Sequence, residues 1–102
     1  MPLFKDISVE LYGMDIRVLA VLDVLDEIFM NVAGRRAIIT SAREGTHSPN
    51  SLHYKGRALD LRNRDLSAEQ NQRVVNLLRS RLGADWDVVV EKDHIHIELD
   101  PK

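Results

Sequence analysis

Two short stretches of the chain alternate polar and apolar residues with the period of a β-strand, and they limit the possible folds more than any other feature. In residues 57–62, Asp60 and Arg62 share one face and two leucines share the other. In residues 94–99, two histidines and a glutamate share one face, and two isoleucines and a leucine share the other. Successive side chains of a strand point to opposite faces, so each stretch has one polar and one apolar face. We expect the two strands to be neighbours in one sheet.

Three of the four histidines lie in these stretches or just before them, close to acidic residues. His53 precedes Asp60 by seven residues, and Gly56 between them allows the backbone to turn. Zinc takes histidine nitrogen and carboxylate oxygen at roughly 2.0–2.2 Å. His53, Asp60 and one of His94 or His96 would supply three ligands. The alternative is that they are ordinary polar residues near a sheet edge, which the clustering of three histidines with acids disfavours.

The remaining segments predict helices with recognisable ends. Asp15 is a suitable N-cap and Gly34 a suitable C-terminal stop for a long amphipathic helix, and Ser67 with Gln70 has the form of a capping box. The expected elements are an edge strand or extended arm at 7–12, a helix at 15–32, a strand at 36–41, a helix at 67–82 and a strand at 86–91.

These elements predict an α+β fold. The expected architecture is a small, mostly antiparallel sheet with two helices packed on one face and a zinc cleft on the other. Strand 57–62 is expected beside the hairpin 86–99, since the ligands meet only there. A length of 102 residues is typical of one domain, so residues 1–102 are expected to form a single domain.

Composition excludes some classes of function. The chain has no cysteine, which removes disulfides and thiolate zinc sites, and its net charge of −2 gives no strong attraction to nucleic acid or anionic membrane. A nucleic-acid binder would need the local cluster Lys55, Arg57, Arg62 and Arg64, which is better explained as a solvated face. The first residues lack a signal-peptide pattern and no membrane span is visible, so synthesis in the cytoplasm is expected.

The chain carries two motifs at fixed spacing, Ser-x-His-x-x-Gly-x-Ala-x-Asp and Asp-His-x-His. Their residues are Ser51, His53, Gly56, Ala58 and Asp60, followed by Asp93, His94 and His96. Together they resemble the zinc peptidases that cut peptidoglycan. That group includes the D-Ala-D-Ala carboxypeptidases, the phage L-Ala-D-Glu endopeptidases and the related hedgehog signalling domain. The resemblance covers roughly residues 37–99.

The resemblance implies a zinc peptidase domain with His53, Asp60 and His96 as the Zn²⁺ ligands. Zinc would polarise the scissile carbonyl and lower the pKa of its bound water toward about 7. Asp93 is expected as the base that takes the proton of this water, and His94 is expected to stabilise the transition state. Glu91 is the reserve candidate for the base.

The resemblance also implies a substrate. Arg43 and Ser51 would bind the stem peptide of bacterial peptidoglycan, cut as by a D-Ala-D-Ala carboxypeptidase or an L-Ala-D-Glu endopeptidase, while His47 is expected to be a solvated loop residue. The enzyme would be a monomer without nucleic-acid or membrane partners. It would act on the cell wall after release, as an endolysin does, or as part of a phage particle. The alternative function is a non-catalytic zinc-containing binding or structural module.

Overall fold

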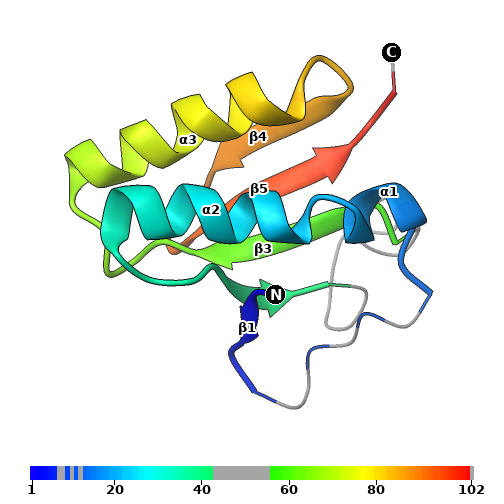
Figure 1. Cartoon of the computed structure of the whole chain (residues 1–102), viewed down its shortest axis with the longest axis horizontal. Coiled ribbons are helices and arrows are strands. Elements are labelled where there is room, and N and C mark those ends of the chain that lie inside the picture. Colours follow the sequence, from blue (N-terminus) through cyan, green and yellow to red (C-terminus); the bar gives the residue numbers. More distant parts are fainter. Residues whose placement is uncertain (7–8, 10, 12, 43–55, 102) are drawn as a thin grey trace.

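The computed structural model describes residues 1–6, 9, 11, 13–42 and 56–101, which contain one five-stranded sheet and three helices (Figure 1). The strands lie in the order β1-β2-β3-β5-β4. The elements are β1 (Leu3–Phe4), α1 (Ile16–Leu19), α2 (Leu22–Ala33), β2 (Ile38–Ser41), β3 (Ala58–Arg62), α3 (Ala68–Leu82), β4 (Trp86–Val90) and β5 (His94–Leu99).

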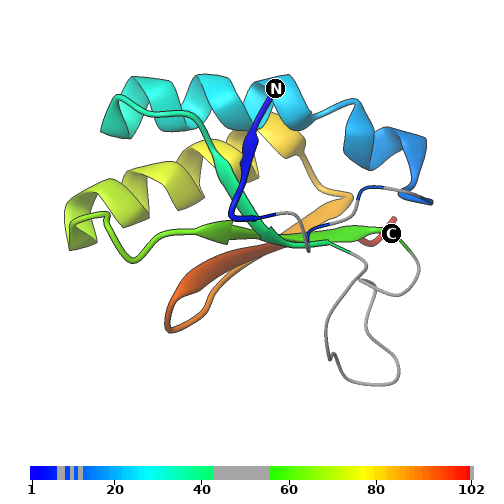
Figure 2. The ribbon, with the colours of Figure 1, turned by 90° about the horizontal axis from the view of Figure 1, so that it is seen from below.

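The two long helices lie side by side on one face of the sheet, as both views show (Figures 1 and 2). All strand pairs are antiparallel except β1 with β2, which is parallel. The prediction of an α+β fold with a mostly antiparallel sheet and two helices on one face is therefore confirmed. The zinc cleft on the other face remains a prediction. Within the described part of the chain, no helix has the length and apolar character that crossing a membrane requires.

The register between β3 and β5 separates the polar from the apolar side chains. Asp60 pairs directly with His96, and Arg62 with His94, so these four share one face of the sheet. The residues between them point into the core beneath α2 and α3. The large side chains of these two strands that are fully buried are Leu59, Leu61, Ile95 and Ile97. Burial of this apolar face fixes the register, because a shift of one residue would exchange the two faces.

The predicted helix at 15–32 is in fact two helices, α1 and α2, separated at Ala20 and Val21. The apolar spacing of Val18, Leu22 and Leu25 continues across the break, and all three are buried, so the pattern does not reveal it. The predicted N-cap is present, with the Asp15 carboxylate accepting a hydrogen bond from the Arg17 amide.

Other predicted helix ends are also present. Gly34 ends α2 in the left-handed conformation, with φ of 69°. The Ser67 and Gln70 side chains form the reciprocal capping box at the start of α3.

The first strand lies elsewhere than predicted. Residues 7, 8, 10 and 12 of the predicted segment 7–12 are outside the described residues, while β1 forms earlier, at Leu3–Phe4. Its parallel pairing is held by the Leu3 amide on the Ala37 carbonyl at 2.8 Å and the Lys5 amide on the Ile39 carbonyl at 3.0 Å. A two-residue strand is too short to show a sequence period, which is why the pattern missed it.

Candidate metal centre

The polar face of β3 and β5 brings Asp60 and His96 into direct contact. Their Cα atoms are register partners, and Asp60 Oδ1 lies 2.9 Å from His96 Nδ1. The Asp60 side chain is largely buried for a charged group, with a residue exposure of 8%. A buried carboxylate requires a charged or hydrogen-bonding partner, and His96 supplies one.

His94 also lies near the same carboxylate oxygen. Its Nε2 lies 3.7 Å from Asp60 Oδ1, and its Nδ1 lies 2.8 Å from Asp93 Oδ1. One oxygen of Asp60 therefore faces a ring nitrogen from each of two histidines.

Each histidine is held by a carboxylate at the nitrogen that points away from Asp60. Asp93 contacts His94 in this way, and Glu98 contacts His96, with 2.8 Å between Oε1 and Nε2. A carboxylate that accepts the outer N–H of a histidine fixes the ring and leaves the other nitrogen's lone pair for a metal. The two sequence motifs do not include Glu98. The signal was available, because Glu98 is two residues from His96 on the same strand face.

The charges around His96 alter its titration. The hydrogen bond that the His96 ring donates to Asp60 raises the pKa of His96, the one that it donates to Glu98 adds to this rise, and burial of the ring opposes it. The hydrogen bond from His94 lowers the pKa of the exposed Asp93 carboxyl. Asp93 is therefore ionised at neutral pH and can hold the His94 ring.

The donor set fits a zinc ion in kind, but the donors do not have the spacing of a closed tetrahedral site. Two donors on one tetrahedral zinc, at bonds of roughly 2.0–2.2 Å, lie about 3.3–3.6 Å apart. The distances from Asp60 Oδ1 to His96 Nδ1 and to His94 Nε2, 2.9 and 3.7 Å, lie on either side of that range. Nitrogen and carboxylate oxygen are also donors that zinc accepts.

The remaining predicted site residues either lie outside the described residues or line one of two pockets. His53, Arg43 and Ser51, together with His47, lie outside the described residues. Glu91 is exposed and lines a pocket of about 270 Å³ with Asn63, Lys92 and residues at the start of α3. Asp93 and His94 line a separate pocket of about 480 Å³.

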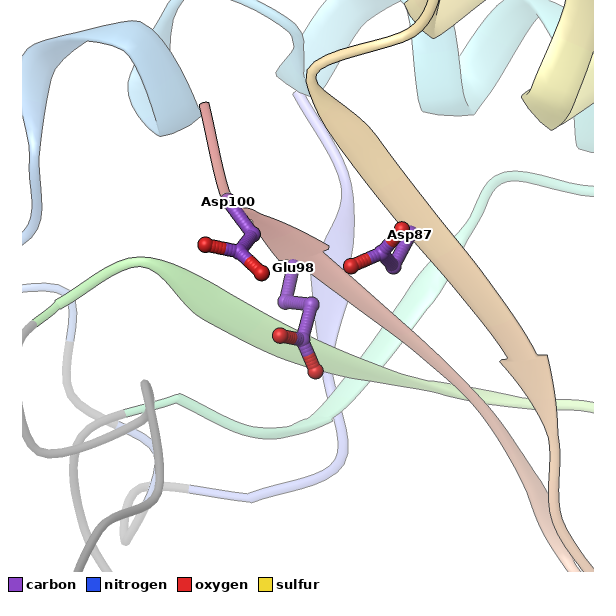
Figure 3. Close-up of side chains that lie close together, drawn as sticks. All are labelled: Asp87, Glu98 and Asp100. Carbon is purple, nitrogen blue, oxygen red and sulfur yellow. The ribbon is translucent and has the colours of Figure 1, made fainter. Parts of the chain in front are cut away.

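Three acidic side chains form a second group that could hold a metal ion, which the sequence analysis did not predict. Asp87 on β4, Glu98 on β5 and Asp100 just after β5 lie close together (Figure 3), and their ligand oxygens lie within 4.8 Å of one another. The register explains the group, since Asp87 pairs with Glu98. Carboxylates alone suit hard cations such as Ca²⁺ rather than zinc.

Two comparisons with known proteins agree on the family. The profile of the hedgehog amino-terminal signalling domain matches residues 12–98, most of the chain. The Indian hedgehog B protein of Danio rerio is 38% identical over 56 residues, which are 55% of this chain and 13% of that protein. The match thus covers only a small part of the fish protein's length.

This match overturns the predicted function. The family is one of signalling domains, so hydrolysis of the peptidoglycan stem peptide by a carboxypeptidase or endolysin is wrong, and the stem peptide is not the partner. The predicted location, in which the protein is made without a signal peptide and acts on the cell wall or in a phage particle, is wrong for the same reason. The cause of the error is chemical. The two motifs specify donor atoms for a metal, and the same donors serve both catalytic and structural zinc sites.

One half of the predicted resemblance is confirmed. The hedgehog signalling domain is related in fold to the zinc peptidases, which explains why the motifs resemble both. The profile that matches is that of the signalling domain and not that of a carboxypeptidase family. With residues 12–98 matched, the chain belongs to the hedgehog amino-terminal signalling domain family.

Proposed function

We propose that residues 1–102 form a single zinc-containing recognition domain that works in signalling by binding a partner protein. The family and the name of the relative, Indian hedgehog B protein, support a signalling role. Zinc at this place would hold β3 to β5 on the polar face of the sheet, as a structural ion does. This is the non-catalytic alternative that the motifs left open.

One observation carries the metal part of the proposal. Asp60 Oδ1 lies near ring nitrogens of both His94 and His96, and each ring is oriented by its own carboxylate. Two histidines with such orienting carboxylates and one shared buried carboxylate are more than solvated surface residues need. We propose Asp60, His96 and His53 as the ligands, with His94 beside them.

Metal analysis of Asp60→Ala tests the ligand assignment. The purified wild-type chain is expected to hold one zinc under mild chelation, and Asp60→Ala is expected to lose most of it, since the remaining ligands bind zinc weakly. Asp87→Ala is the matched control, because it removes a nearby carboxylate from the acidic group of Figure 3 but none of the proposed zinc ligands. Stoichiometric zinc in Asp60→Ala would contradict the assignment.

Competition tests the recognition part. If the chain binds the same kind of partner as its relative, the unlabelled zinc-loaded chain should displace a labelled amino-terminal domain of the Indian hedgehog B protein from responding cells. Asp60→Ala should compete less well if zinc shapes the binding surface. An absence of competition at saturating concentration would leave the zinc site without this signalling role.

A second candidate function is hydrolysis of a peptide bond at the same metal. It is favoured by the ionised Asp93 carboxylate, 2.8 Å from His94 Nδ1 and beside the proposed ligands. In this case zinc would activate a water, and Asp93, or Glu91 in its place, would take the proton while His94, Arg43 and Ser51 contact the substrate.

Cleavage of a peptide library, read by mass spectrometry of new termini, distinguishes the two functions. A hydrolase should produce new termini in the wild type, and Asp93→Asn should retain zinc but lose most turnover. If the zinc-loaded wild type produces no new termini, the domain acts by recognition alone.

A further inference from the structure

The pocket of about 480 Å³ beside His94 is rich in positive charge. Among the described residues it is lined by Lys5, Thr40, Arg62, Arg64, Asp93 and His94. These residues lie just after β1, on β2, at the end of β3 and just beyond it, and in the β4–β5 hairpin. With His94 neutral, three cations face one carboxylate, which leaves the lining with a formal net charge of +2.

Three carboxylates near the pocket already have partners, and the first is Asp6, whose Oδ2 lies 3.6 Å from Lys5 Nζ. Asp93 is held by His94 Nδ1 at 2.8 Å. Asp65 follows Arg64 directly, but its two oxygens bind Arg35 at 2.7 and 2.8 Å. Within the part of the chain that the structure describes, neither the Arg62 nor the Arg64 guanidinium has an ion-pair partner.

The positions of these two arginines are well defined by the fold. Arg62 is the last residue of β3 and the register partner of His94, so its side chain lies on the polar face. Its backbone carbonyl accepts a hydrogen bond from Arg35 at 3.1 Å, which fixes the chain just before Arg64. The backbone of Lys5 is also held, because its amide donates to the Ile39 carbonyl at 3.0 Å.

We propose that this pocket binds an anionic group with two or more oxygens, a carboxylate or a phosphate, through the guanidinium groups of Arg62 and Arg64. A planar guanidinium donates two parallel hydrogen bonds to such a group, and a concave site concentrates the field of several cations. Lys5 also lines the pocket, where its charge is shared with Asp6. The pocket is of the size of a small-ligand site rather than an extended polymer groove. Anion binding here does not depend on the metal.

Nuclear magnetic resonance of the whole chain, freed of metal by chelation, tests the proposal. Inorganic phosphate and succinate are titrated separately at constant ionic strength while the arginine Nε–Hε signals are followed. One or both anions are expected to shift the Arg62 and Arg64 signals in a saturable way, while the signal of Arg73, exposed on α3, stays in place. Saturation by phosphate alone identifies a phosphate site, and saturation by succinate identifies a carboxylate site. Unsaturable shifts shared by Arg73, or no shifts, would overturn the proposal.

Two substitutions sharpen the test. Arg62→Gln and Arg64→Gln should each weaken binding about tenfold or more, because each removes a charge-assisted hydrogen-bonding fork. Arg73→Gln is the matched control and should leave the affinity unchanged. Arg64 is exposed, so Arg64→Gln carries the test even if Arg62→Gln does not fold. Wild-type affinity in Arg64→Gln would refute the site.

Asp60→Ala separates this pocket from the zinc site. It removes a proposed zinc ligand and no cation of the pocket, so anion binding should persist in it. Loss of anion binding in a folded Asp60→Ala protein would mean that the anion binds at the metal centre instead, and the proposal would be wrong.

Discussion

At the scale of single residues, the polar face is organised by Asp60, whose Oδ1 faces both His94 and His96. Glu98 orients the His96 ring, so Glu98→Gln should leave the fold intact but weaken zinc binding by about 10–100-fold. Competition of the variant with a chelator of known affinity measures this. Asp100→Asn is the control, because it alters the acidic group of Figure 3 but not the His96 contact. Equal affinities of Glu98→Gln and wild type would remove Glu98 from the site.

A second residue-scale prediction concerns Gly56. Its φ is +71°, and a Cβ there would lie 2.6 Å from the Gly13 carbonyl oxygen, which is backbone and cannot move aside easily. The Gly56 carbonyl also accepts a hydrogen bond from the Asp15 amide at 2.8 Å. Gly56→Ala should therefore destabilise the protein by about 2 kcal/mol or more. Urea unfolding measures the change, with Gly34→Ala as a control that has positive φ but no close atom.

The positions of individual side chains could be predicted only where a single sequence pattern determined them. The alternation in 57–62 and 94–99 correctly predicted which side chains share a face. It also put Glu98 on the same face as His96, but the contact itself depends on side-chain rotamers, which alternation does not determine. The group of Asp87 with Glu98 and Asp100 needed the β4–β5 register, which no single strand reveals.

At the scale of elements, Arg35 ties the end of α2 to the end of β3. Its guanidinium binds both oxygens of Asp65, donates to the Arg62 carbonyl and lies over the Phe29 ring, 4.9 Å from the centroid. Lysine keeps the positive charge but cannot donate two parallel hydrogen bonds to one carboxylate. Arg35→Lys should therefore reduce the free energy of unfolding by about 1–2 kcal/mol. Arg73→Lys, on the exposed surface of α3, is the control and should change little.

The contribution of the Arg35–Asp65 ion pair to the free energy of unfolding depends on pH. The hydrogen bond from Arg35 lowers the pKa of the Asp65 carboxyl below its ordinary value. The ion pair therefore contributes fully to stability above the pKa of Asp65 in the unfolded chain, about 3.9. This contribution is lost as the pH falls through the lower pKa of Asp65 in the folded chain. The stability difference between wild type and Arg35→Lys should shrink over that acidic range. Asp65 is half exposed, which keeps the effect small. A difference that is constant from pH 6 to pH 2 would show that Asp65 is not involved.

Elements with strong end signals were the ones predicted well. The Ser67 capping box and Gly34 determine helix ends through local hydrogen bonds, so the sequence alone is sufficient for them. The break at Ala20 and Val21 has no such signal, since Val21 makes no side-chain cap contact and the apolar period continues. The two-residue β1 depends on tertiary pairing with β2 and is invisible to local patterns.

At the scale of the whole molecule, the fold predicted from the sequence is confirmed, and the function predicted from it is wrong. The layers follow from the apolar faces of β3, β5, α2 and α3, which have one efficient arrangement. The role of the domain does not follow from its donor atoms, because a zinc site that stabilises and a zinc site that hydrolyses use the same residue types. The family match shows the family and excludes the peptidoglycan substrate, and the signalling role of this chain is a proposal that rests on it.

The last prediction concerns the stability of the whole fold. If zinc joins Asp60 on β3 to His96 on β5, it binds the folded chain and not the unfolded one, so it must raise the melting temperature. At free zinc about 100 times the dissociation constant, the gain is about 2.7 kcal/mol, or roughly 10–20 °C for a domain of this size. Chelation should remove this gain in the wild type and in Asp87→Ala. The melting temperature of Asp60→Ala should be the same with and without chelator. Identical melting of wild type with and without zinc would mean that the ion does not hold the two strands together, whatever the donors on the polar face.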